Sequence, residues 1–268
     1  MEGAGVRLNR VFGEDNSKLD PFLLLDDFHS DNPDDYIAGF PWHPHRGIET
    51  ITYMLHGMVQ HEDSLGNAGI IEAGDIQWMT AGSGIIHQEM PARTDGLMGG
   101  FQLWANLPSL HKMMDPRYQE VKKTQIPEIS PSEGVKAKII CGEISGTKGP
   151  VQDIVTDPEY LDVSIDPQSE FKHRIKNGHN VFAYVIDGEG YFDESKEYLV
   201  SKDNLVIFND GEEVLISTDK NKVRFLLISG RPIGESVEWH GPIVMNTKEE
   251  IRTAFQEYRE GIFIKKGN

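Results

Sequence analysis

Residues 40–57 read Phe40-Pro-Trp-His-Pro-His-Arg-Gly-Ile-Glu-Thr-Ile-Thr-Tyr-Met-Leu-His-Gly57, and this stretch indicates the fold. From Glu49 onward it is a short apolar run that ends at a glycine turn, as a buried β-strand does. Similar runs, separated by Gly, Asn, Asp and Pro, recur at residues 70–71, 76–79, 100–104, 135–141, 181–186, 204–208 and 223–228. This pattern is typical of an all-β sandwich or barrel and argues against alternating βαβ units.

Residues 108–134 differ from the rest of the chain. They are rich in Pro, Lys, Glu and Ser and show no sustained alternation, which is typical of a connector. We therefore predict two β-barrel domains, residues 1–130 with the connector and residues 131–268.

The two halves also resemble each other. Ile51-Thr-Tyr-Met-Leu-His-Gly57 is similar to Phe182-Ala-Tyr-Val-Ile-Asp-Gly188, and Gly74-Asp-Ile-Gln-Trp-Met79 is similar to Lys202-Asp-Asn-Leu-Val-Ile-Phe208. In both halves a strand runs into a glycine turn. The similarity suggests a duplicated barrel.

One segment near the C-terminus predicts a helix. Thr247 and Glu250 form a capping-box pattern, and Gly261 marks the end. Between them, apolar residues recur at i, i+3, i+4 and i+7: Ile251, Ala254, Phe255 and Tyr258. We expect this amphipathic helix to pack on a barrel flank.

Composition limits the class of protein. The 268 residues are 38% hydrophobic, enough for real cores, and no run approaches the roughly 20 apolar residues of a membrane helix. The N-terminus lacks the order of a secretory signal, and the single cysteine, Cys141, has no partner for an internal disulfide. We expect a cytoplasmic protein that does not enter the membrane. The formal charge of −17 disfavours direct binding of nucleic acid.

Two short pairs suggest a metal site. In an extended segment, residues i and i+2 point to the same side, so His43 and His45 face together, and so do His87 and Glu89. A single His-x-His pair is weak evidence, because histidines also recur by chance or cap turns. If the fold brings both strands together, three nitrogens and one oxygen meet at one point.

The motifs around these pairs resemble a known family. Gly39, His43-x-His45, Glu49 and Gly57 are similar to the first cupin motif, and Gly74-Asp75 with the turn Gly82-Ser-Gly84 and His87 is similar to the second. Within the cupins, the resemblance is to the pirin family. It is carried by residues 40–50, 61–63, 77–91, 102–108 and 241–247, so it spans nearly the whole chain.

The resemblance implies two cupin (jelly-roll type) β-barrels with a C-terminal helix. It implies metal ligands at His43, His45, His87 and Glu89. Glu49 is a candidate for supporting the ligands, but a simple pairing of Glu49 with Arg46 or a neighbour is at least as plausible.

The second half carries no matching ligand set. Aligning Tyr53 with Tyr184 puts Arg174 and Lys176 where His43 and His45 stand, and Leu215 falls near the place of His87. We therefore expect one ion per chain. His173 and His179 lie near a charged run and are expected at the surface.

Three imidazoles and one carboxylate leave room for exchangeable ligands on one divalent ion, which suits Fe(II), our preferred metal, and equally Mn, Co, Ni or Cu. A closed tetrahedral zinc site is the structural alternative. Some pirins are quercetin 2,3-dioxygenases, so the resemblance implies a flavonol-like aromatic substrate and dioxygen. Glu89 then serves as both ligand and catalytic base.

Other residues near the motifs are less specific. Aromatic and methionine side chains that suit an aromatic substrate suit a packed core equally well: Phe40, Trp42, Met54, Met98, Phe101 and Trp104. His56 and His61-Glu62-Asp63 are the other polar candidates. Their simpler interpretation is a hairpin end, because Gly57 precedes and Leu65-Gly66-Asn67 follows the second group.

Two other hypotheses compete with the enzyme. One is a non-enzymatic, iron-dependent module whose oxidation state controls binding of a protein partner, a role implied by the resemblance to eukaryotic pirins. The other is a structural cupin in which the metal only stabilises the fold.

Overall fold

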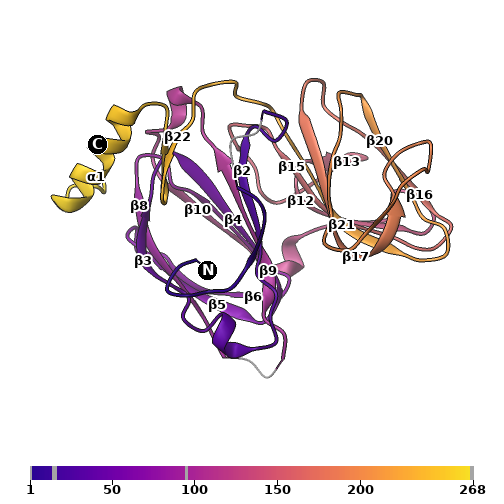
Figure 1. Cartoon of the computed structure of the whole chain (residues 1–268), viewed down its shortest axis with the longest axis horizontal. Helices are drawn as coiled ribbons and strands as arrows, with labels where there is room; N and C mark the ends of the chain where they lie inside the picture. Colours follow the sequence, from indigo (N-terminus) through magenta and orange to yellow (C-terminus); the bar gives the residue numbers. More distant parts are fainter. Residues whose placement is uncertain (1, 14–16, 94–95, 266–268) are drawn as a thin grey trace. The chain divides into compact units, whose positions relative to one another are not determined.

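The computed structural model describes residues 2–13, 17–93 and 96–265. Over these residues the chain is mainly β-structure, with a single α-helix, α1 (Lys248–Arg259), near the C-terminus (Figure 1). Short 3-10 helices lie at Pro33–Asp35, Ser109–His111 and Lys123–Gln125. The prediction of an all-β fold with a terminal helix is confirmed. No helix in the described part of the chain has the length and apolar character needed to cross a membrane.

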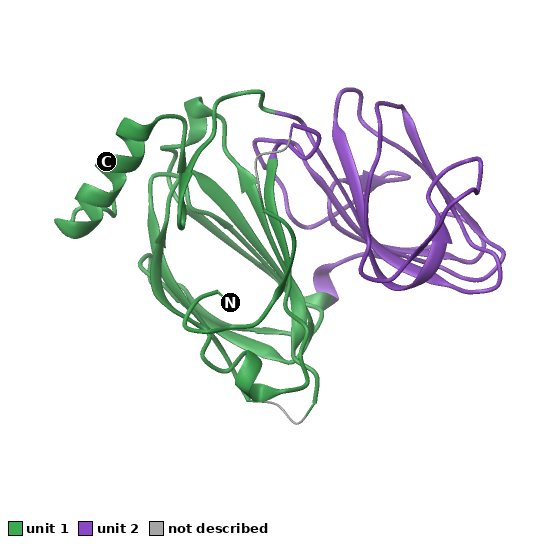
Figure 2. Ribbon diagram, viewed as in Figure 1, with its two compact units in different colours: residues 1–15, 22–123, 233–268 green, residues 16–21, 124–232 purple. Residues whose placement is uncertain are grey.

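Unit 1 is a barrel of two antiparallel sheets that face each other (Figure 2). It consists of Met1–Asp15, Phe22–Lys123 and Ile233–Asn268. The larger sheet has the order β1 (Asn9–Phe12), β2 (Phe22–Asp27), β9 (Gly99–Asn106), β4 (Ile48–His56), β7 (Ile76–Thr80) and β10 (Arg117–Val121). The smaller sheet has the order β3 (Phe40–His45), β8 (Ile85–Pro91), β5 (Met58–Asp63) and β6 (Ala68–Glu72).

Unit 2 is the second barrel and consists of Asn16–Pro21 and Thr124–Pro232 (Figure 2). Its sheet has the order β11 (Glu128–Ile129), β12 (Val135–Cys141), β15 (Glu159–Ile165), β21 (Val223–Gly230), β17 (Asn180–Tyr191), β20 (Glu213–Ser217) and β16 (Glu170–Arg174). The short strands β18 (Leu199–Ser201) and β19 (Leu205–Ile207) also pair with β17, and β13 (Glu143–Ile144) pairs with β14 (Thr147–Lys148).

Matching irregularities support the duplication. The pairing of β4 with β9 shifts register between Met54 and His56, just before Gly57. The pairing of β17 with β21 shifts between Val185 and Asp187, just before Gly188. Both glycines have a positive φ, +76° and +73°, which glycine adopts without strain. The same bulge therefore precedes the same turn in each barrel.

The interiors of the two barrels differ. Unit 2 is filled by a continuous apolar cluster in which Leu161, Val163 and Phe225 are fully buried. In unit 1 the buried set includes polar side chains, among them His45, His61 and His87. Because buried polar groups are costly unless they are paired, the polar interior of unit 1 indicates the position of a site.

The unit boundaries differ from the expected division at residue 130. Residues 233–268, with β22 (Glu238–His240), β23 (Ile243–Met245) and α1, belong to unit 1. The capping box at Thr247 and Glu250 is formed as predicted, and Ala254 of α1 is buried with Ile243, Met245 and Phe263. A chain that returns to its first compact unit leaves no mark in local sequence pattern, so the sequence alone predicts contiguous domains.

The expected connector also contains regular structure. β10 pairs along its whole length with β7 and so completes the edge of the larger sheet of unit 1. Its side chains are mostly half-buried, which explains the lack of apolar alternation in the sequence. The boundary between the units follows at Lys123.

Arg46 anchors the returning segment. Its side chain is 2% exposed; Nε donates to the Ser83 carbonyl at 2.7 Å and Nη2 to the Phe263 carbonyl at 2.9 Å. It also forms a 2.8 Å ion pair with Glu257 of α1. Next to it, Gly47 lets the backbone of β23 approach closely, since an added Cβ would lie 1.9 Å from the Val244 carbonyl oxygen.

Replacing Arg46 with methionine should lower the free energy of unfolding by about 3 kcal/mol, because buried carbonyl oxygens lose their donor. The measurement is urea denaturation followed by tryptophan fluorescence. Arg252→Met is the matched control, since its ion pair with Glu249 is largely exposed and should contribute little. Equal effects of the two substitutions would contradict the anchoring role.

Candidate metal centre

Two adjacent strands of the smaller sheet bring the predicted ligands together. β3 and β8 are antiparallel, with His43 directly opposite His87 and a register shift between Phe40 and His43. Along β8 burial alternates, so His87 and Glu89 point inward while Gln88 between them does not. His45 is 3% exposed and faces the same interior. The structure thus places all four side chains on one face.

The three imidazoles converge. The ring centroid of His43 lies 4.8 Å from that of His45 and 4.3 Å from that of His87. One donor atom from each of the three rings lies within 4.8 Å of the others.

Hydrogen bonds assign the tautomers of two rings. His43 Nδ1 lies 2.9 Å from the Pro41 carbonyl, and His45 Nδ1 lies 2.9 Å from the Pro242 carbonyl. Because a carbonyl oxygen only accepts, each Nδ1 is the donor and each Nε2 carries a lone pair. The two Nε2 atoms lie 3.0 Å apart. Two bare acceptors at this distance repel unless a cation lies between them.

Burial favours the neutral form of the His45 and His87 rings. It lowers the pKa of His45 to about 3, with a further contribution from the neighbouring His43. Burial also lowers the pKa of His87 well below its ordinary value, and the other histidines of the site add to the effect. Neutral imidazole is the form that binds a metal.

These residues fit a transition metal. Two nitrogens at right angles on one ion, each about 2.1 Å from it, stand about 3.0 Å apart, as the Nε2 atoms of His43 and His45 do. Neither ring nitrogen of His87 has a hydrogen-bond partner among the described residues, although both are buried. A bound ion would satisfy the nitrogen that carries the lone pair, whereas an apolar ligand would not.

Glu89 is held from the larger sheet. Its side chain is 8% exposed, and Oε1 lies 3.1 Å from the hydroxyl of Thr52, which also lies 2.7 Å from Oε1 of Gln102. One hydroxyl proton cannot serve both oxygens. With the Gln102 amide turned so that its NH₂ faces Thr52, the amide donates to the hydroxyl and the hydroxyl donates to Glu89.

Glu49 lies away from this group. It belongs to β4 with the opposite parity to Thr52, so it points to the other face of the larger sheet. It is 1% exposed and accepts a 2.7 Å hydrogen bond from Thr80, and burial raises its pKa. Arg46 pairs with Glu257 instead. The predicted alternative was that Glu49 pairs with Arg46 or a neighbour. Its partner is the neighbour Thr80, on the adjacent strand β7.

His61 was missed. Residues 61–63 end β5 directly before the turn of the β5–β6 hairpin, as interpreted, and the fold also buries His61, which lies opposite Glu89 and is 1% exposed. It forms a second group of candidate ligands with His87 and Glu89, again with donor atoms within 4.8 Å. The signal that was available is the spacing of His61 and Asp63 at i and i+2 in an alternating segment.

A cavity of about 840 Å³ opens onto the site, with His43, His45 and Glu89 in its wall. Of the six aromatic and methionine candidates, Phe40, Met98 and Trp104 line it. Trp42 is 49% exposed. The cavity also has wall residues that were not predicted as part of a site: Val6, Leu8, Arg10, Leu24, Phe28, Tyr36, Val59, Trp239, Gly241 and Pro242.

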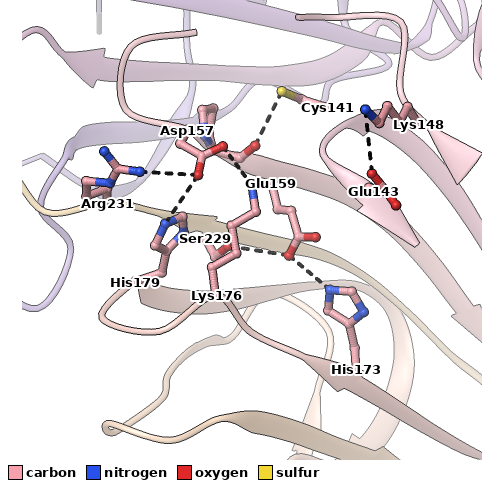
Figure 3. A network of polar contacts seen from close by, with 11 residues as sticks. Cys141, Glu143, Lys148, Asp157, Glu159, His173, Lys176, His179, Ser229 and Arg231 are labelled. Atoms are coloured by element: carbon pink, nitrogen blue, oxygen red, sulfur yellow. Dashed lines mark hydrogen bonds and ion pairs between the residues drawn. The ribbon is translucent and has the colours of Figure 1, made fainter. Parts of the chain in front are cut away.

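Two histidines of unit 2 take part in a network of polar contacts (Figure 3). His173 is 8% exposed and its Nε2 lies 2.9 Å from Glu159, which is also buried. His179 contacts Asp157, and its side chain is 3% exposed. The expectation that both histidines lie at the surface is wrong.

A register difference of one residue explains the error. The sequence alignment placed Arg174 and Lys176 at the positions of His43 and His45, but both are exposed, and the inward residues of this segment are Phe171, His173 and Ile175. A shift of one residue turns every side chain to the opposite face. Both groups of candidate ligands that the described residues bring together lie in unit 1.

Comparison with known proteins agrees with this architecture. A family model described as Pirin matches residues 5–105, and one described as Pirin C-terminal cupin domain matches residues 160–264. Pirin of Homo sapiens is 41% identical over 262 residues, which cover 96% of this chain and 88% of the human protein. A Pseudomonas aeruginosa protein named "Putative quercetin 2,3-dioxygenase PA3240" is 40% identical over 266 residues, 97% of this chain and 93% of that protein.

A solved structure is similar over the same length. The crystal structure of quercetin 2,3-dioxygenase from Acinetobacter baumannii superposes with a TM-score of 0.89 at 33% identity and covers 98% of this chain and 93% of that chain. Both family models, the identities and the coverage lead to one conclusion: the chain belongs to the pirin family.

Proposed function

We propose that this protein is a metal-dependent dioxygenase that cleaves flavonols such as quercetin, with one divalent transition metal bound by His43, His45, His87 and Glu89. The observation that carries the proposal is that His43, His45 and His87 bring donor atoms within 4.8 Å of one another, and that His87 does the same with Glu89. A cavity of about 840 Å³ has His43, His45 and Glu89 in its wall. The names of the Pseudomonas and Acinetobacter relatives support the reaction type.

The donor set suits several metals, and we favour Fe(II). When bound, the ion supplies the redox chemistry with dioxygen and polarises a substrate oxygen. The chain supplies the rest of the site. The Pro41 and Pro242 carbonyls fix the rings of His43 and His45 so that both Nε2 atoms face the same point.

The cavity provides the contacts for an aromatic substrate. Phe40, Trp104 and Trp239 contribute flat apolar surfaces, while Thr52 and Gln102 add polar groups beside Glu89. In our proposal the Glu89 carboxylate accepts the proton of the flavonol hydroxyl, and the aromatic walls hold the ring system and exclude water. Thr52 keeps the carboxylate oriented while the proton moves.

The activity itself is the first test. Protein reconstituted with Fe(II) without oxygen should, on addition of quercetin and air, consume the visible absorbance of quercetin and one dioxygen per flavonol. Spectrophotometry and an oxygen electrode measure both. The absence of turnover with Fe, Mn, Co, Ni and Cu would exclude the enzyme and favour the regulatory module, for which partner capture that depends on the metal's oxidation state is the direct assay.

The ligand assignment has its own test. The double substitution of His43 and Glu89 by alanine should abolish stoichiometric metal, because it removes one donor from each strand. Metal content of purified protein measured by mass spectrometry gives the result. His111→Ala, which changes a histidine of unit 1 outside the site, should keep one ion per chain. Unchanged metal in the double variant means that the ligands lie elsewhere.

Thr52 should matter to the reaction more than to the metal. Thr52→Val removes the hydroxyl beside Glu89 and should lower kcat by about 10-fold or more while one metal per chain remains. Thr50→Val is the matched control, because Thr50 is also buried on β4 and points to the same face. The measurement is steady-state kinetics with quercetin. An equal loss of kcat in both variants would indicate general damage to β4 and not a role of the Thr52 hydroxyl.

A further inference from the structure

A row of polar side chains crosses the larger sheet of unit 1 and leads away from the proposed metal centre. Thr52 of β4, which contacts Glu89, lies opposite Gln102 of β9. Gln102 lies opposite Asp26 of β2, and Asp26 lies opposite Arg10 of β1. The strands β4, β9 and β2 lie side by side, with β1 at the edge (Figure 1). All four side chains of the row are in the wall of the cavity.

The second barrel shows that the fold does not require a polar row here. Matching the bulge and turn at Gly57 with those at Gly188 places Ala183 at the position of Thr52. From there, the row of opposite residues runs through β21, β15 and β12: Leu227, Leu161 and Ile139. All of these side chains are buried in the apolar cluster of unit 2. The polar row is thus a property of the cavity of unit 1 and not of the barrel.

The far end of the row is an ion pair in the cavity wall. Nε and Nη2 of Arg10 each donate to one oxygen of Asp26, both at 2.9 Å, and Nη1 lies 3.2 Å from Oε1 of Glu2. Asp26 is 5% exposed, and burial raises its pKa although Arg10 opposes the rise. The Arg10 fork uses one lone pair of each carboxylate oxygen, so each oxygen has a second lone pair. Asp26 can therefore accept a hydrogen bond from a hydroxyl in the cavity.

Unit 2 contains a similar fork that faces away from its core. Nε and Nη2 of Arg224 donate to the two oxygens of Asp162, at 2.9 and 2.7 Å. Asp162 alternates along β15 with the core residues Leu161 and Val163, so it points to the opposite face of the strand. The two forks are alike in chemistry, but the fork of unit 1 faces a cavity. Asp162 is therefore a matched control for Asp26.

The spacing within the sheet suits an extended aromatic ligand. Asp26 is two strands away from Thr52, which is about 10 Å along the sheet. Leu24 and Trp104 lie opposite each other on β2 and β9 and are also in the cavity wall, so the polar row borders an apolar surface. A planar ligand that meets the metal through one hydroxyl can lie on this surface and place a second hydroxyl at Asp26. Flavonols such as quercetin have this form, since their outer rings carry further hydroxyls.

We propose that Asp26, held by Arg10, is a specificity-determining residue that accepts a hydrogen bond from a ring hydroxyl at the end of the substrate away from the metal. This inference rests on the proposed function and narrows its substrate class to uncharged, polyhydroxylated flavonols. A carboxylate at that end of the ligand is disfavoured, because two carboxylates, Glu2 and Asp26, and the single guanidinium of Arg10 leave a net negative charge there.

The test compares the binding of quercetin with that of the parent flavonol, which has only the hydroxyl beside the carbonyl. Both are titrated without oxygen into Fe(II)-loaded protein, and quenching of tryptophan fluorescence gives the affinity without turnover. We expect wild-type protein to bind quercetin at least about 10-fold more tightly, as a hydrogen bond to a charged group implies. Asp26→Leu, which introduces the residue type of Leu161 in unit 2, should remove most of this preference, whereas Asp162→Leu should keep it. An unchanged preference in Asp26→Leu would overturn the proposal.

A second measurement uses the wild type alone and so does not depend on the folding of a variant. Quercetin that is methylated at every hydroxyl except the one beside the carbonyl keeps its oxygens but has no proton for Asp26. It should bind at least about 10-fold more weakly than quercetin, because the carboxylate then has no donor. Equal affinity for the methylated compound and quercetin would overturn the proposal.

Turnover separates this inference from the proposed function. A preference for quercetin that Asp26→Leu removes, without turnover of quercetin, would refute the dioxygenase and leave the role of Asp26 standing. Turnover without that preference would refute the role of Asp26 and leave the dioxygenase standing. Binding of neither compound would refute both.

Discussion

The alternation of side chains along three adjacent strands is the constraint on which the site depends. β3, β8 and β5 each carry a pair at i and i+2, namely His43 and His45, His87 and Glu89, and His61 and Asp63. Because the pairs lie in register on neighbouring strands, six polar side chains share the inward face of the smaller sheet. A slip of one residue in any pairing would turn a pair away from the interior.

The end of the chain completes this arrangement. His45 and Arg46 are neighbours, and both bind the returning segment: His45 donates to the Pro242 carbonyl, and Arg46 contacts Phe263 and Glu257. The segment that closes the cavity with Trp239 and Pro242 is thus the same segment that orients one ring of the proposed centre. Stability of the C-terminal packing and geometry of the site are coupled through two adjacent residues.

The two barrels show how one scaffold leads to two outcomes. In unit 2, His173 faces inward from β16, but the residue opposite it on β20 is Val214, and a buried carboxylate, Glu159, satisfies the ring. In unit 1, His87 lies opposite His43 and no described residue satisfies its nitrogens. Burial without a partner favours the neutral ring, whose free nitrogen can bind a ligand. In unit 2 the Glu159 carboxylate already contacts the ring nitrogen of His173.

The sequence by itself determined the β-class, the duplication, the terminal helix with its capping box, and the pairs at 43, 45, 87 and 89, because these depend on local periodicity and local motifs. It did not determine the return of residues 233–268 to unit 1, the inward face of β16, or the place of His61 beside Glu89. Each of these depends on strand register or on contacts between residues distant in the chain. Only the tertiary structure decides such features, since hydrogen bonding between strands, and not the order of residues within one strand, sets which side chains meet.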